Sequence, residues 1–238
     1  MSKLSIELLN CRDASADIRR AVEDVFCASF VGGQRQSLET YFHHVRQLLL
    51  ARDGGRIVGF QFYQTHEVAG CPVRHFSLAG RRDDARYRGL QGQFGRLLIR
   101  QAILRTPPWR PVYLAGVTNS PKSYANFYAV GGKCYPDIPK PGANPFGDWY
   151  GQVAQQLGMA GVDERGLLRH RMQGIGFGLK EATDASHPMS QAYDRYVEDN
   201  RDHGVFTLIE LLPARDLPAY LARQLFKRPR AAAKREST

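Results

Sequence analysis

The sequence has few of the features that would place it in a specialised class of protein. It has four cysteines, Cys11, Cys27, Cys71 and Cys134, and no two of them form a C-x-x-C pair or a metal-site spacing. No apolar run approaches the roughly 18 residues of a membrane span. A secretory signal has a long apolar core and a small-residue cleavage site, and the first residues contain neither. We therefore expect a cytoplasmic protein with reduced thiols, no metal site and no membrane span.

Acidic residues are in the minority. The 238 residues contain 33 Lys and Arg against 23 Asp and Glu, which gives a formal net charge of +10. Half of this excess lies between Arg223 and Thr238, where six basic residues accompany one acid. The remaining excess favours an acidic ligand, such as a nucleotide phosphate or an acidic carrier protein. No basic face is interleaved with aromatic residues, so we expect no nucleic-acid partner.

The length and composition predict one globular domain. Hydrophobic residues make up 43% of the chain and charged residues 24%, which is typical of such a domain. We expect it to cover residues 1–226, with a core at 1–135, a helical elaboration at about 136–204, and a closing strand and helix at about 205–226. Residues 227–238 form a basic end with few apolar anchors, for which the sequence predicts disorder.

Hydrophobic periodicity and turn residues predict the order of elements in the core. A first strand at 5–9 is followed by two helices, one from Asp13 or Ser15 and one after Ser37. The turn Asp53-Gly54-Gly55 and a second turn at 69–72 separate three antiparallel strands. A helix from about residue 90 to 102, a strand at 112–117 and a helix with Ser120 as its cap follow. This order argues for an α+β fold.

One stretch combines features that suit an anionic ligand. From Ser77 to Leu98, a strand leads into a loop rich in arginine and glycine, and the loop opens a helix. Glycines let backbone N–H groups approach a ligand, and a helix N-terminus adds free donors. Arginines add charge with a geometry that fits phosphate. The stretch therefore predicts an anion cradle suited to a pyrophosphate.

The loop resembles the acyl-CoA-binding loop of the GCN5-related N-acetyltransferases (GNAT), whose pattern is Q/R-x-x-G-x-G/A. Two registers fit. Arg86-Tyr-Arg-Gly89-Leu-Gln91 places Gln at the last position, whereas Arg88-Gly89-Leu-Gln-Gly92 carries one inserted residue. The two registers stay open, and in both of them Arg86, Arg88, Gly89 and Gly92 belong to the cradle.

The segment Tyr113–Tyr135 is similar to the next strand and helix of the same family. Tyr128 precedes Gly132 by four residues, as the family's helix tyrosine does. Lys133 stands where the family usually has Phe, and Asn119 lies two residues before the family's usual Asn. With the upstream helices and strands, the resemblance extends over roughly residues 1–135.

This resemblance implies a fold and a reaction. The fold would have a mixed, mostly antiparallel central sheet flanked by helices. The donor would be acetyl-CoA or another acyl-CoA, and its pantetheine arm would pair with the backbone of Leu78, Ala79 and Gly80, with Asn119 nearby. A neutral amine would attack the thioester directly, and Tyr128 would give a proton to the departing thiolate. The chain would then be an N-acyltransferase, and most simply an N-acetyltransferase.

The general base and the exact function stay open at this point. The strand at 73–80 has no carboxylate, and its nearest titratable group is His75; His66 and Glu67 could act through water. One alternative keeps the fold but takes its acyl group from a long-chain acyl carrier protein. Another is a catalytically inactive binding or regulatory protein of the same fold. The missing carboxylate favours inactivity, whereas the retention of Tyr128 argues against it.

Overall fold

The computed structural model describes residues 4–31, 35–169, 178–179, 189–200 and 202–218. Most strands belong to one central sheet: β1 (Leu4–Asn10), β3 (Gln47–Asp53), β4 (Arg56–Val68), β5 (Cys71–Arg81), β6 (Val112–Thr118), β7 (Lys133–Tyr135), β8 (Leu167–Leu168) and β10 (Gly204–Leu211). A separate pair joins β2 (Phe30–Val31) to β9 (Gly178–Leu179). The helices and 3-10 turns are η1 (Cys11–Asp13), α1 (Ala16–Ser29), α2 (Arg35–His44), η2 (Ala85–Tyr87), α3 (Leu90–Leu104), α4 (Pro121–Tyr128), α5 (Asp148–Gln156) and α7 (Ser190–Tyr196).

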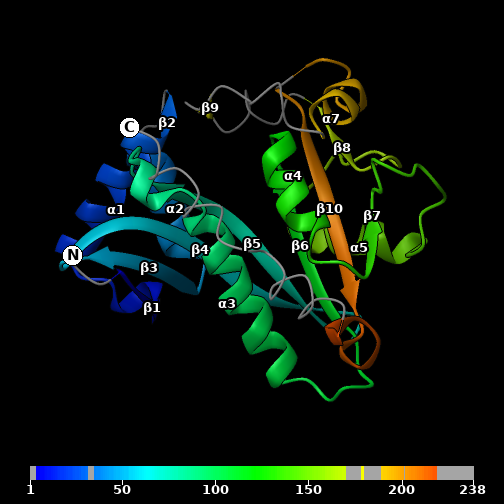
Figure 1. Ribbon diagram of the computed structural model, residues 1–238, viewed down its shortest axis with the longest axis horizontal. Helices are drawn as coiled ribbons and strands as arrows, with labels where there is room; N and C mark the ends of the chain where they lie inside the picture. Colours follow the sequence, from blue (N-terminus) through cyan, green and yellow to red (C-terminus); the bar gives the residue numbers. More distant parts are fainter. Residues whose placement is uncertain (1–3, 32–34, 170–177, 180–188, 201, 219–238) are drawn as a thin grey trace, which may run out of the picture.

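The central sheet is mixed and mostly antiparallel. Its strand order is β1-β3-β4-β5-β6-β10-β7, with β8 paired to β10. The ladder between β5 and β6 is parallel, and the other recorded ladders of the described residues are antiparallel. The expected α+β fold, with helices flanking a mostly antiparallel sheet, is confirmed (Figure 1).

The two faces of the sheet carry separate cores. Leu49 on β3 belongs to a cluster with Phe94 and Leu98 of α3, whereas its neighbours Leu48 and Leu50 pack with α1. Because successive strand residues point to opposite faces, α3 and α1 must cover opposite sides of the sheet. Figure 1 shows this layering, with α3 in front of the sheet.

Local signals explain where the helices begin. The Oγ atom of Ser15 accepts a hydrogen bond from the N–H of Ile18 at 3.3 Å and caps α1. The Oγ atom of Ser120 accepts from the N–H of Ser123 at 3.2 Å and caps α4, and Pro121 occupies the first position of that helix. Both starts agree with the sequence prediction, because such caps are encoded locally.

The chain after β7 closes the sheet and supports its middle. β10 lies between β6 and β7, and α7 packs against α4 through Tyr193 and Tyr124. The hydroxyl of Tyr193 donates a hydrogen bond of 2.8 Å to the carbonyl of Thr118, the last residue of β6. The described part of the segment is less helical than expected, because residues 157–166 form turns and β8 joins the sheet.

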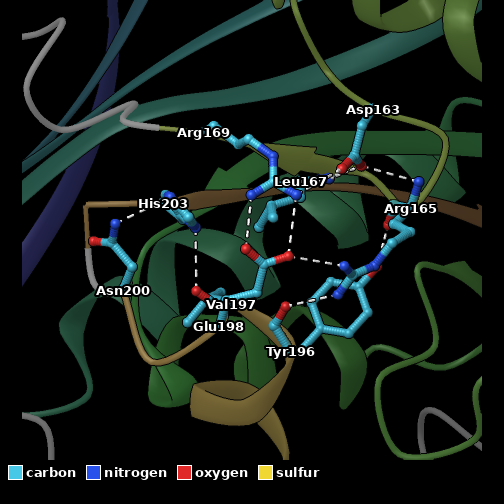
Figure 2. A network of polar contacts seen from close by, with 9 residues as sticks. All are labelled: Asp163, Arg165, Leu167, Arg169, Tyr196, Val197, Glu198, Asn200 and His203. Carbon is cyan, nitrogen blue, oxygen red and sulfur yellow. Dashed lines mark hydrogen bonds and ion pairs between the residues drawn. The ribbon is translucent and has the colours of Figure 1, made fainter.

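A network around Glu198 fixes this segment (Figure 2). Arg169 binds the Glu198 carboxylate with both guanidinium Nη atoms, at 2.7 and 3.0 Å, and Arg165 binds it at 3.0 Å. These hydrogen bonds, Arg169 first, lower the pKa of Glu198 to about 2, although burial opposes them. Asp163 accepts hydrogen bonds from the backbone N–H groups of Arg165 and Leu167, so the network ties the turn after α7 to β8.

The end of the chain is described only in part. Residues 213–218 are helical, and the N–H of Ala214 donates to the carbonyl of Pro108 at 2.9 Å. The rest of the closing helix, predicted to continue to residue 226, and the basic end at 227–238 lie outside the described residues. Within the described ranges, no helix is both long enough and apolar enough to span a bilayer.

Candidate active site

The central feature of the site is a gap within the sheet. The parallel ladder between β5 and β6 pairs Val73 with Tyr113 at one end and Phe76 with Gly116 at the other. Beyond this last pair, both strands continue without pairing to each other, and Figure 1 shows them diverging toward α4. In the described part of the chain, β5 beyond Phe76 has no strand partner on its β6 side. That edge is the place where an extended ligand could pair as an added strand.

A β-bulge in β5 marks the start of the gap. The β4–β5 register shifts between Gln61, which opposes Ala79, and Tyr63, which opposes Phe76. The amide of the buried Gln61 donates hydrogen bonds of 3.0 Å to the carbonyls of Phe62 and Ser77 and so fills the bulge. Bulges bend a strand and increase its twist, which turns the second half of β5 away from β6.

Helix α4 packs where the two strands separate. The ring of Phe127 lies 5.5 Å from that of Phe76 in an edge-to-face arrangement. A Cβ at Gly116 would come within 2.7 Å of the Phe127 ring, so only glycine fits there. The next residue, Tyr128, ends α4 and stacks on Tyr124 with ring centroids 5.9 Å apart. Tyr128, the predicted proton donor, is thus carried by a helix that packs where β5 and β6 separate.

The predicted cradle lies at the N-terminus of α3. Gly89 occupies the cap position with φ +85°, and no side chain caps the first turn. A Cβ at Gly89 would meet nothing within 4 Å among the described residues, so the space beside this glycine is open. Helix termini with free N–H groups bind anions such as phosphate, because the donors and the helix dipole both favour negative charge.

The arginines of the preceding loop have different roles. The guanidinium of Arg82 donates to the carbonyl of Ile57 at 3.3 Å. Arg86 forms an ion pair of 2.8 Å with Asp84, and its hydrogen bonds lower the pKa of the Asp84 carboxyl. Arg88 is exposed, and no ion pair to it is recorded in the part of the chain that the structure describes. Among Arg82, Arg86 and Arg88, Arg88 is therefore the one whose side chain has no recorded partner in the described residues.

The loop is held in place independently of any ligand. Tyr87 is buried, and its hydroxyl donates a hydrogen bond of 2.8 Å to the carboxylate of Asp53 in the β3–β4 hairpin. This hydrogen bond and burial raise the pKa of Tyr87, so the phenol stays protonated as a donor. A Cβ at Gly59 would lie 2.3 Å from the Leu90 side chain, so β4 approaches the start of α3 very closely. The cradle is thus fixed to the sheet before a ligand binds.

One long stretch of the sequence contains no acidic residue. Between Asp84 and Asp137 the sequence contains no Asp or Glu, but it contains six Arg and two Lys: Arg86, Arg88, Arg96, Arg100, Arg105, Arg110, Lys122 and Lys133. This stretch includes α3, β6 and α4. This stretch is therefore strongly basic, although Glu210 pairs with Lys133 and Asp84 with Arg86. The local excess of positive charge is visible in the sequence, beyond the net charge of the chain.

The remaining predicted residues surround the gap. Leu78, Ala79 and Gly80 belong to the part of β5 beyond its ladder with β6, as the pantetheine prediction requires. Asn119 lies between the end of β6 and the cap of α4. Gly92 lies in the first turn of α3, where a Cβ would come within 3.3 Å of Arg96.

The candidate bases lie on β5 and on its neighbour β4. His75 on β5 pairs with Ala115 of β6, and its ring centroid is 5.9 Å from that of His66 on β4. Burial, followed by the charge of Arg46, lowers the pKa of His66. A lowered pKa keeps this imidazole neutral at neutral pH, as a proton acceptor must be. Among the described residues, no group of three His, Cys, Asp or Glu is arranged to hold a metal ion.

Comparisons with known proteins give distant structural similarity. No protein-family model matches the chain, and no curated protein matches its sequence. A ribosomal-protein-alanine N-acetyltransferase from Brucella melitensis biovar Abortus 2308 matches 52% of this chain and 87% of its own, with 22% identity and a TM-score of 0.37. A GNAT family N-acetyltransferase from Escherichia coli, in complex with CoA, matches 53% of this chain and 68% of its own, with 14% identity and a TM-score of 0.40.

An aminoglycoside N-acetyltransferase in complex with CoA matches 54% of this chain and 84% of its own, with 16% identity and a TM-score of 0.39. These structures are N-acetyltransferases. They belong to the class that the loop and Tyr128 suggested from the sequence. Each identity is below 25% and each TM-score is below 0.5, so the reaction of this chain must be inferred from its own residues.

Proposed function

We propose that this chain is an acyl-CoA-dependent N-acyltransferase that transfers an acyl group, most simply acetyl, to an amine. The observation that carries the proposal is the gap between β5 and β6, which opens beyond Phe76 and Gly116. The uncapped N-terminus of α3 follows the same strand β5 and is preceded by Arg88 and Gly89. One site thus offers strand edges for an amide-containing arm and donors for a pyrophosphate.

Each predicted residue has a role in this proposal. Arg88 and the backbone N–H groups at Gly89–Gly92 would bind the pyrophosphate. The backbone of Leu78–Gly80 would pair with the pantetheine arm, and Asn119 would border it. Arg86 would act mainly as a support, because Asp84 already holds its charge.

Two side chains would move protons. His75, with His66 beside it, would take the proton that the amine loses as it attacks the thioester carbonyl. Tyr128 would give its phenolic proton to the sulfur as the carbon–sulfur bond breaks. A phenol with a pKa near 10 is protonated at neutral pH, and it regains its proton from solvent after each turnover.

Donor binding tests the first half of the proposal. Acetyl-CoA, a longer acyl-CoA and an acyl carrier protein should be titrated into the purified chain by calorimetry. We expect the CoA thioesters to bind and free CoA to compete with them. Absence of binding by every CoA thioester would refute the proposal, whereas binding of the carrier protein alone would leave a transferase with a different donor.

Substitution of Tyr128 tests the second half. Tyr128→Phe removes only the hydroxyl, so we expect kcat for thiol release in the presence of a panel of amines to fall by about 10² to 10⁴. Donor affinity should stay almost unchanged, because the ring is retained. The matched control is Tyr124→Phe, since the Tyr124 hydroxyl bonds the backbone of Pro136 and Ile138 and not a substrate. Full activity of Tyr128→Phe would leave the proton donor unassigned.

A further inference from the structure

A second polar cavity lies on the α3 face of the sheet, apart from the gap between β5 and β6. It has a volume of about 170 Å³ and is bordered by the end of α3 and by β1, β3, β4 and β5. Gln101 and Ala102 of α3 and Arg105, the residue after the helix, line it and lie 12 or more positions after Gly89. At 1.5 Å per residue, this places the cavity about 20 Å along the helix from the cradle.

The lining of this cavity is basic and contains no acid. Arg74 reaches it from β5 and Arg105 from the C-cap position of α3. Neutral polar groups come from Gln47, Thr65 and Gln101. In the described residues, no ion pair is recorded for either arginine. The cavity therefore repels cations and offers several donors to an anion.

Arg74 supplies the observation that points to a ligand. Its Nη1 atom is buried and has no hydrogen-bond partner within the described part of the chain. Buried polar groups nearly always have a partner, and a guanidinium keeps its charge because its pKa lies far above neutral. Its ladder neighbours, Thr65 on β4 and Leu114 on β6, bring no carboxylate. An acceptor is needed at this position.

Water is the simplest occupant, but an anion fits the charge better. At about 30 Å³ per molecule, the cavity has room for roughly five waters. Waters would satisfy Arg74 Nη1 without balancing two guanidinium charges. The C-terminus of α3 contributes a partial negative charge of about one half, which opposes an anion but is smaller than the two positive charges. A carboxylate or phosphate matches the fork geometry of arginine.

We propose that this cavity is a binding site for a small ligand that carries a carboxylate or phosphate group, held by Arg74 and Arg105. Gln47 and Gln101 would donate further hydrogen bonds to its oxygens, and Thr65 at the rim would contact the rest of the ligand. This site is separate from the cradle at Gly89 and does not depend on the proposed transfer reaction.

Calorimetry with two anions tests the proposal. Inorganic phosphate and acetate should each be titrated at constant ionic strength into an Arg88→Gln background, which removes the charge of the cradle. We expect at least one of them to bind, and binding of only one identifies the group that the ligand carries. Arg74→Gln should weaken that binding at least tenfold, and Arg105→Gln should weaken it too, while Arg110→Gln should not.

Two results would overturn the proposal. Binding of neither anion would mean that the cavity holds water only, and equal affinity with and without Arg74 would place the anion elsewhere. Arg105 is exposed, so Arg105→Gln keeps the test valid if the Arg74 variant folds poorly. A crystal soaked in selenate, with anomalous scattering, should place the selenium beside Arg74 in the wild-type chain and not in Arg74→Gln.

Discussion

At the scale of single residues, the arginines between β5 and α3 show how one residue type takes several roles. Arg82 donates a hydrogen bond to a backbone carbonyl, and Arg86 is paired with Asp84, so both guanidinium groups have partners before a ligand binds. The sequence alone placed both Arg86 and Arg88 in the cradle. Asp84 is close to all of these arginines in the sequence. It pairs with Arg86 because of the turn formed by η2, which the sequence pattern does not specify.

Arg88→Glu should weaken binding of CoA thioesters by well over tenfold, because a charge-assisted contact becomes a repulsion. The fold should be unaffected, since Arg88 is exposed. Arg110→Glu changes the net charge equally on an exposed loop beyond the far end of α3, and it should alter the affinity much less. Calorimetry on both variants measures their affinities for a CoA thioester. An equal loss of affinity in the two variants would show that only the net charge matters and would contradict a specific contact to Arg88.

Two tyrosines one helical turn apart on α4 also differ. Tyr124 is fully buried; its hydroxyl donates 2.8 Å to the carbonyl of Pro136 and accepts 3.0 Å from the N–H of Ile138. Burial raises the pKa of Tyr124 well above its ordinary value. The sequence alone does not show that the Tyr124 hydroxyl is engaged, because its partners lie beyond β7. Only the family resemblance singled out Tyr128.

At the scale of elements, the contact between β4 and α3 determines where the cradle lies. Gly59→Ala should destabilise the chain by about 1–3 kcal/mol, because the new Cβ would lie 2.3 Å from the Leu90 side chain. Displacement of the first turn of α3 should weaken CoA binding as well. Urea unfolding and calorimetry would measure the two effects.

Gly95→Ala, within α3, is the matched control for Gly59→Ala. A Cβ at Gly95 would meet nothing within 4 Å, and alanine is the better helix former, so this variant should gain about 0.5–1 kcal/mol. CoA affinity should be preserved. A stable Gly59→Ala variant with normal affinity would show that the start of α3 adjusts without affecting the cradle.

The Glu198 network should make stability depend on pH in acid. The pKa of Glu198 falls from an ordinary value near 4.5 to about 2 in the folded chain, because the arginines bind its charged form. Its contribution is therefore complete above about pH 5, and it is lost as the pH falls toward 2. Glu198→Gln should lower the melting temperature at pH 7, and the difference from wild type should shrink at pH 3.

The control for this substitution is Glu164→Gln. Glu164 is exposed and has no ion pair among the described residues, so its substitution should change the melting temperature little at either pH. The effect of Glu198→Gln should also weaken with added salt, because the network is at the surface. A constant difference between pH 7 and pH 3 would contradict the assigned cause.

The elements of the core could be predicted from the sequence because their signals are local. Ser15, Ser120 and the turn at Gly54 lie where the structure has a helix cap or a hairpin. The bulge filled by Gln61 could not be predicted, since it depends on the register of two strands. The end of the β5–β6 ladder could not be predicted either, because no local residue pattern specifies where a ladder ends.

At the scale of the whole molecule, the sheet joins distant parts of the chain. β10 pairs with β6 over seven residues, from Val205 with Thr118 to Leu211 with Val112. Tyr193 and the β8–β10 pairing add further links to the end of β6. The later segment thus supports one side of the gap, and the sequence had assigned it no part in the site.

The diverging strands have a consequence for how the protein behaves at high concentration. A strand that lacks a partner on one side can pair with a strand of another molecule, and natural proteins usually protect such edges. Here an edge without a strand partner among the described residues lies in the middle of the sheet, on β5 beyond Phe76. A bound pantetheine arm would cover that edge and lie between the two halves of the sheet. The donor should therefore also act as a solubility factor, so that the chain without it self-associates more readily than the chain with it.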